Sequence, residues 1–166
     1  MRFGLFRGTG SIAVLAILLA MHAQTRAQGP FGTPSSDSAF SIPRADLLQP
    51  EELNRLLRAQ GAAKPLVLQV GSHLLFAQAH IPGSEYAGAG SQPAGLKQLQ
   101  DRVGPLPRKT FIVLYCGCCP WERCPNIAPA YKLLHNLGFT NAKALYIANN
   151  LGTDWVDKGF PVERGR

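Results

Sequence analysis

Four cysteines lie together between Cys116 and Cys124, and the chain has no others. A small disulfide-stapled protein would distribute its cysteines along the chain. Clustered thiols are suited instead to nucleophilic attack, thiol–disulfide exchange or binding of a soft metal ion. Their spacing, Cys-x-Cys-Cys-x4-Cys, is not a standard zinc pattern. The segment therefore indicates one chemically specialised loop.

Cys116 is the cysteine best placed for catalysis. It directly follows the strongest strand signal of the chain, residues 110–115, and a helix is predicted over 125–137. In an open α/β sheet, ligands bind beyond the carboxyl ends of the strands. The loop N–H groups and the helix N-terminus would form a positive cradle there, which lowers the pKa of a thiol. We therefore predict that Cys116 is the nucleophile and has the lowest thiol pKa, with Cys124 competing for the same helix dipole.

The other residues of the loop have several interpretations. The cradle for an anion or substrate is predicted to comprise Gly117, Cys118, Cys119 and Arg123. Cys118, Cys119 or Cys124 could resolve a persulfide on Cys116, or Cys118 or Cys119 could form a disulfide with Cys124. In the alternative interpretation, all four thiols bind Cu(I), zinc or an iron–sulfur cluster. The main prediction requires no cofactor.

Strands and helices are expected to alternate along the chain. Pro50 opens a helix that ends before Gly61, and Pro105 closes a second one. The further elements are strands over 66–70 and 144–148, a helix over 92–103, and a short helix and turn over 155–161. This order predicts an α/β fold with a central parallel sheet flanked by helices on both faces.

The chain resembles the rhodanese-like family of single-domain sulfurtransferases. The likeness spans about residues 42–162. It is carried by His-Ile-Pro-Gly-Ser at 80–84, by Val-Leu-Tyr-Cys at 113–116, and by the leucine, Gly-Phe, Asp-Trp and Gly-Phe-Pro-Val positions from 134 to 162. The resemblance implies a rhodanese-like α/β sheet fold, a persulfide on Cys116 and a structural role for His80. Trp155 is expected to fill the core, and Trp121 to act as a lid or a packing anchor.

Two features depart from that family. Its members usually have an aspartate and an arginine at the end of the first core strand, where this chain has Gln69 and Gly71. The first arginine after Cys116 is Arg123, later than in the family, so the loop is longer and contains three additional cysteines. The resemblance alone therefore does not imply thiosulfate:cyanide chemistry.

The first 27 residues are expected to be a secretory signal peptide. Arg2 and Arg7 precede the apolar run 12–21, and Thr25 and Ala27 suit cleavage before residue 28. A Pro/Gly/Ser-rich linker over 28–41 and a rhodanese-like domain over 42–166 should follow. This predicts an exported protein, periplasmic if the source is a Gram-negative bacterium and otherwise secreted, with no stable membrane span once the signal is removed.

Charge limits the partners. The chain has 17 Lys+Arg and 10 Asp+Glu. The predicted signal peptide contains three of the arginines. Its removal leaves 14 Lys+Arg and a net charge of +4. No basic cluster with interleaved aromatics is present, so nucleic acid is not an expected partner. We expect a monomer that handles sulfane sulfur and meets a small sulfur donor or a partner protein thiol. The alternative is a soft-metal-binding or thiol–disulfide exchange module on a rhodanese scaffold that has lost sulfurtransferase activity.

Overall fold

The structure is a computed structural model that describes residues 41–165 except residue 62. The predicted signal peptide (1–27) lies outside the described residues, and so does the predicted linker (28–41) except for residue 41. Within the described part, no helix is both long and apolar enough to cross a membrane.

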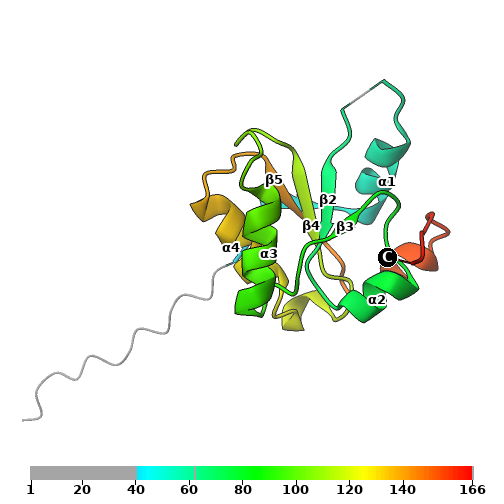
Figure 1. Cartoon of the computed structure of the whole chain (residues 1–166). Helices are drawn as coiled ribbons and strands as arrows, with labels where there is room; N and C mark the ends of the chain where they lie inside the picture. The colour runs from blue at the N-terminus through cyan, green and yellow to red at the C-terminus, as the bar shows by residue number, and fades with distance from the viewer. Residues whose placement is uncertain (1–40, 62, 166) are drawn as a thin grey trace, which may run out of the picture. The chain divides into compact units, whose positions relative to one another are not determined.

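A five-stranded sheet forms the centre of the domain, with all strand pairs parallel (Figure 1). Its order is β1-β5-β4-β2-β3. The strands are β1 (Leu47–Leu48), β2 (Leu66–Gln69), β3 (Glu85–Tyr86), β4 (Ile112–Tyr115) and β5 (Ala142–Leu145). The register pairs Gln69 with Tyr115, so β2 and β4 end level with one another. Residues that follow these two strands must therefore meet at one edge of the sheet.

Helices cover both faces of this sheet. They are α1 (Pro50–Arg58), α2 (His73–Gln78), α3 (Pro93–Val103) and α4 (Ile127–Asn136), with 3-10 turns η1 (Arg44–Asp46) and η2 (Trp121–Arg123) and a π-helical turn η3 (Gly152–Val156). Pro50 and Pro93 each occupy the first position of a helix, where a missing N–H costs no hydrogen bond.

Alternation along β4 divides the core into two layers. Ile112 and Leu114 pack with the buried side chains of α3 and α4, whereas Val113 and Tyr115 pack with Leu53 of α1 and the other cluster. Successive strand residues point to opposite faces, and all four β4 residues are fully buried. The predicted α/β fold, with a parallel sheet flanked by helices on both faces, is confirmed.

The boundaries of some elements differ from the predictions. The strand predicted over 144–148 runs from Ala142 to Leu145, because β4 begins at Ile112 and pairs there with Ala142. The helix predicted from Pro125 begins at Ile127, after a turn. The short helix expected over 155–161 lies over 152–156 instead. Five short elements were not predicted at all: η1, β1, α2, β3 and η2.

Candidate functional site

Cys116 directly follows β4 at the carboxyl edge of the sheet and is 6% exposed. Beside it opens a cavity of about 360 Å³. Cys116, Gly117 and Cys118 line one side of this cavity, and Leu75 and Val156 line its rim. We call it the open cavity. Its lining contains amides, thiols and apolar groups but, among the described residues, no charged side chain.

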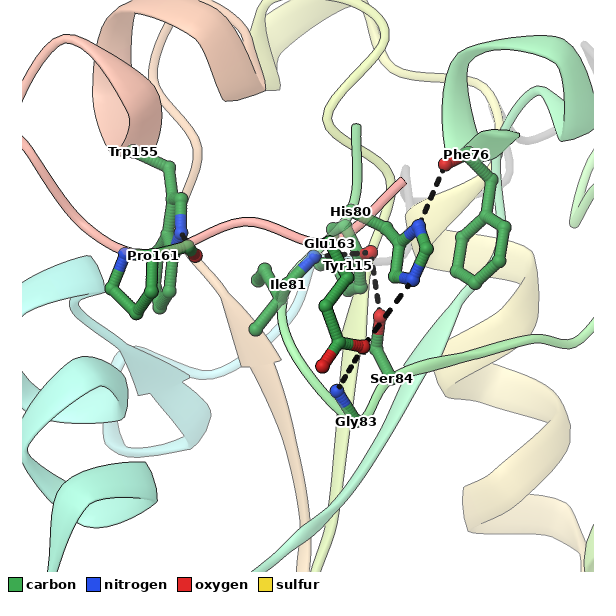
Figure 2. Close-up of polar contacts among 9 residues, drawn as sticks. All are labelled: Phe76, His80, Ile81, Gly83, Ser84, Tyr115, Trp155, Pro161 and Glu163. Carbon is green, nitrogen blue, oxygen red and sulfur yellow. Dashed lines mark hydrogen bonds and ion pairs between the residues drawn. The ribbon is translucent and has the colours of Figure 1, made fainter. Parts of the chain in front are cut away.

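Tyr115 fixes the strand end that presents Cys116 (Figure 2). Its ring is fully buried, its hydroxyl lies 3.0 Å from the Ser84 hydroxyl, and the backbone N–H of Ile81 donates to it over 3.3 Å. Burial raises the pKa of Tyr115 to about 12, so the hydroxyl stays protonated at neutral pH. The turn over 81–84 thus holds the residue next to Cys116 in place.

His80 supports that turn from outside the open cavity. Its Nδ1 lies 2.8 Å from the carbonyl oxygen of Phe76, and its ring stacks on the Phe76 ring with centroids 4.0 Å apart. Its backbone exchanges two hydrogen bonds with Glu163, whose carboxylate also accepts from Gly83 (Figure 2). These contacts fit the structural role expected of His80. Trp155 is fully buried and donates to the Pro161 carbonyl oxygen over 2.8 Å, which confirms that it fills the core.

Gln69 and Gly71, the two departures from the family pattern, both contact the Cys116 region. The buried Gln69 amide donates to the Cys116 carbonyl oxygen over 3.1 Å and accepts from the Gly71 N–H over 3.1 Å. A side chain at Gly71 would place its Cβ 2.9 Å from the Cys116 sulfur. The ends of β2 and β4 are therefore joined by a neutral amide, and a glycine leaves room for the thiol.

The enlarged loop brings the thiols together. The Cys116 and Cys118 sulfurs are 3.0 Å apart, and those of Cys118 and Cys119 are 3.5 Å apart. The Asn126 amide donates to the Cys116 sulfur over 3.4 Å. The sulfurs of Cys116, Cys119 and Cys124 lie within 4.8 Å of one another. All four cysteines belong to the described part of the chain and are unpaired in this structure.

The thiols differ in acidity. The pKa of Cys124 is lowered to about 6, first by a hydrogen bond from the Cys116 thiol and also by the backbone N–H groups of Asn126 and Ile127 at the start of α4. The pKa of Cys116 is raised by its hydrogen bond with Cys124 and by burial, and that of Cys119 is raised to about 12, mainly by burial. The prediction that Cys116 has the lowest pKa is therefore wrong, because the Cys116 thiol donates to Cys124 and the first N–H groups of α4 also stabilise the Cys124 thiolate.

The remaining predicted residues lie in different places. Gly117 has a φ of 71° and accepts a hydrogen bond from Leu151, so the chain turns there in a conformation that suits glycine. Arg123 is exposed on η2 and is not among the residues that line the open cavity. The Trp121 ring packs 5.2 Å from that of Tyr146, and its backbone N–H donates to the Ala148 carbonyl oxygen, so it anchors η2 against the chain after β5.

Sequence reasoning missed three residues of the site. Leu75 belongs to α2, which has no clear sequence signal, and Val156 comes from the π-helical turn. The helix predicted over 125–137 includes Asn126, but this residue precedes α4, and its amide contacts the Cys116 sulfur. Asparagine is frequent at the position directly before a helix. This preference was the one sequence signal available for Asn126.

Comparison with known proteins gives matches to solved structures. No protein-family model matches the chain, and no curated protein does. The Alr3790 protein from Anabaena sp. is 21% identical to this chain, with a TM-score of 0.55. The matched region covers 71% of this chain and 92% of the Anabaena chain. The solution structure of the rhodanese-like domain from the same Anabaena protein is 21% identical over 72% of this chain and 79% of that chain, with a TM-score of 0.53. The described domain has a rhodanese-like fold.

A eukaryotic structure supports the same assignment of fold. The single-domain sulfurtransferase RDL2 of Saccharomyces cerevisiae is 16% identical over 72% of this chain and 95% of that chain, with a TM-score of 0.52. At these identities the likeness extends to the fold and not to activity. This rhodanese-like domain has a cysteine-rich loop after β4.

Proposed function

We propose that this rhodanese-like domain carries sulfane sulfur as a persulfide on Cys116. The observation that carries the proposal is the position of Cys116, which follows β4 at the carboxyl edge of the sheet and lines an open cavity of about 360 Å³. The yeast protein of similar fold is a sulfurtransferase. Because that likeness extends to the fold alone, the chemistry is argued from the residues around Cys116.

Loading of Cys116 is a thiol exchange on sulfur. The Cys116 sulfur attacks the outer sulfur of a donor R–S–SH, a new S–S bond forms, and the donor S–S bond breaks. The leaving R–S group takes up the Cys116 proton and departs as R–SH, so the products are Cys116–S–SH and a thiol. Gly117 and Cys118 face the same cavity and would contact the transferred sulfur.

Unloading can use the nearest thiol. The Cys118 sulfur is 3.0 Å from that of Cys116. Its attack on the Cys116 sulfur forms a Cys116–Cys118 disulfide and releases the outer sulfur with both protons as hydrogen sulfide. A thiol of a small molecule or of a partner protein in the cavity would instead attack the outer sulfur, take it over and restore the Cys116 thiol. Cys118 is thus proposed to be the resolving cysteine.

The cavity lining favours a donor without a dense negative charge. Gln69 and Gly71 replace the aspartate and arginine usual in the family, and Arg123 lies outside the lining. The rim residues Leu75 and Val156 are apolar and 40% and 38% exposed. An organic persulfide or trisulfide therefore fits better than thiosulfate, a dianion whose desolvation would have no cationic side chain to offset it.

Mass spectrometry of the reduced protein tests the proposal. After exposure to an alkyl hydropersulfide, the Cys116 peptide should gain one sulfur atom. Cys116→Ser should abolish this gain, and Cys118→Ser should retain loading but slow the release of hydrogen sulfide. Arg123→Ala is the control for the donor site and should load at the wild-type rate. Absence of an adduct with every donor, or an adduct that persists in Cys116→Ser, would contradict a persulfide on Cys116.

We further propose that the protein is exported. The support is the sequence of residues 1–27, with its basic start, apolar run and small residues before position 28. Fractionation of the expressing cell, followed by N-terminal sequencing, should place the mature chain outside the cytoplasm with an N-terminus at residue 28. A chain retained in the cytoplasm with its first residues intact would contradict export.

A further inference from the structure

A second, much smaller cavity also borders Cys116, and we call it the small cavity. Its volume is about 10 Å³, close to the smallest space that holds one water-sized particle. Three of its lining residues are Cys116, Cys119 and Cys124. We call these three the thiol triad. Their sulfurs lie within 4.8 Å of one another, so three soft donors surround a space the size of a single atom.

The fold holds the triad from three directions. Cys116 is fixed by β4. Cys124 returns to it because η2 turns the chain back, with the Trp121 N–H donating to the Ala148 carbonyl oxygen and the Cys124 N–H donating to the Trp121 carbonyl oxygen over 3.2 Å. Cys119 lies on the loop between them. The extra residues of the loop thus bring Cys119 and Cys124 to Cys116. The proposed persulfide chemistry, which uses Cys116 and Cys118, does not require these extra residues.

The chemistry of the donors selects the ion. Thiolates favour Cu(I), zinc and iron–sulfur clusters over the hard cations that prefer oxygen. An iron–sulfur cluster needs more room than the small cavity offers. Structural zinc almost always takes four ligands, whereas the triad supplies three. Beyond the three sulfurs, the lining consists of apolar and aromatic side chains and Gly117: Trp121, Ile127, Leu145 and Ile147.

The dimensions of the triad fit a three-coordinate ion. Three sulfurs in a plane at about 2.3 Å from a central ion are about 4 Å apart. The present separations, at most 4.8 Å, require the sulfurs to move inward by only a few tenths of an ångström each. The site would carry a net negative charge once the thiols are deprotonated. The N-terminus of α4, a helix of ten residues beginning at Ile127, faces that charge with its positive end.

We propose that Cys116, Cys119 and Cys124 form a three-coordinate site for Cu(I), beside the apolar and aromatic lining of the small cavity. Cys118 lies outside the triad and faces the open cavity, and so is not a ligand. Binding of Cu(I) displaces the three thiol protons and involves no change in oxidation state. Because Cys116 belongs to both sites, an occupied triad would prevent persulfide formation on Cys116.

Titration of the reduced full chain with Cu(I) in the presence of a coloured competing chelator tests the site. The wild type should bind one Cu(I) per chain and show the luminescence of Cu(I) thiolates. Cys119→Ser should weaken binding by more than about 100-fold, beyond the effect usual for a change outside the ligands. Cys118→Ser is the matched control and should change the affinity by less than about 10-fold.

The outcomes separate this proposal from the persulfide proposal. Loss of Cu(I) binding in Cys118→Ser equal to that in Cys119→Ser would overturn the three-ligand site, as would tighter binding of Zn(II) than of Cu(I). Circular dichroism of each variant tests whether it is folded. Cys124→Ser is a second variant of the thiol triad and should also lose Cu(I) binding. Sulfur loading of Cys119→Ser by an alkyl hydropersulfide is measured separately. In Cys119→Ser, normal loading with lost Cu(I) binding supports both proposals. In the wild type, normal Cu(I) binding without loading contradicts only the persulfide.

Discussion

Within the loop, acidity and access to the open cavity belong to different cysteines. Cys116 lines the open cavity, but burial and its thiol neighbours raise its pKa. Cys124 has a pKa lowered to about 6 and lines a shallow groove of about 310 Å³ on the outer surface. The thiol that is ionised at neutral pH is therefore not the one at the end of β4. A sulfur donor in the open cavity meets a protonated thiol, so its leaving group must accept the proton.

This separation predicts the order of alkylation in the reduced, metal-free protein. Iodoacetamide should modify Cys124 first, and the rate should rise from pH 5 to pH 7 and then level off, because the thiolate is half formed near pH 6. Peptide mass mapping over this pH range checks the order. Cys124→Ser should remove the fast phase. Fastest modification of Cys116 would show that the thiolate lies at the end of β4 instead.

A second prediction concerns the residue that precedes Cys116. Tyr115→Phe removes the hydroxyl that accepts from Ile81 and contacts Ser84, and leaves both groups buried without that partner. The free energy of unfolding should fall by about 1–3 kcal/mol. Urea denaturation measures it. Tyr146→Phe is the matched control and should cost less than about 0.5 kcal/mol, since no hydrogen bond of the Tyr146 hydroxyl is found among the described residues. Equal losses in the two variants would contradict the anchoring role of Tyr115.

At the scale of elements, close backbone approaches set the position of the helices around the site. Gly95 lies within α3 and is buried, and a Cβ there would lie 2.5 Å from the Ala89 backbone nitrogen. The loop over 88–91 in turn meets Asn126, whose side chain accepts from the Ser91 N–H over 3.0 Å. A displacement of α3 would therefore be transmitted through this loop to the start of α4 and to the thiols.

Gly95→Ala is expected to reverse the usual effect of such a change. An alanine in a helix interior normally stabilises by about 1 kcal/mol relative to glycine. Here the contact with Ala89 should dominate and destabilise the domain by about 1–3 kcal/mol. Thermal or urea unfolding measures the sign. The control Gln98→Ala, at an exposed position of the same helix, should remain within about 0.5 kcal/mol of wild type. A stabilised Gly95→Ala would show that α3 can move away from the loop.

The sequence was sufficient for the elements with strong periodicity but not for the short ones. The apolar run of β4, the proline start of α1 and the proline that follows α3 predicted these elements closely. The two-residue strands β1 and β3 exist only through pairing with β5 and β2, so no local pattern marks them. For the site, the cysteine cluster was predicted from residue types and spacing. The order of thiol pKa values was not, because it depends first on the hydrogen bond between the Cys116 and Cys124 thiols, which the folded loop creates, and then on the N–H groups at the start of α4.

At the scale of the whole domain, the site and a second polar cluster lie apart. The thiols follow the carboxyl end of β4, whereas the polar cluster joins η1, α4 and β5. There, the Asp46 carboxylate accepts from the Tyr131 hydroxyl over 2.6 Å and from the Lys143 ammonium over 2.9 Å. The three groups come from distant parts of the chain, so this cluster helps to close the edge of the sheet at β1.

The Asp46 cluster gives the domain a predictable acid sensitivity. The Tyr131 hydroxyl, and secondarily Lys143, lower the pKa of Asp46 below its usual value. A carboxyl group with a lowered folded-state pKa stabilises the fold above its unfolded pKa of about 4, and this contribution disappears as the pH falls through the folded value. Asp46→Asn should therefore destabilise the domain at pH 7, and the difference from wild type should shrink between pH 5 and pH 2. Urea unfolding at several pH values measures this, with Asp157→Asn, an exposed position, as the control. A difference that stays constant down to pH 2 would mean that Asp46 acts through its shape and not through its charge.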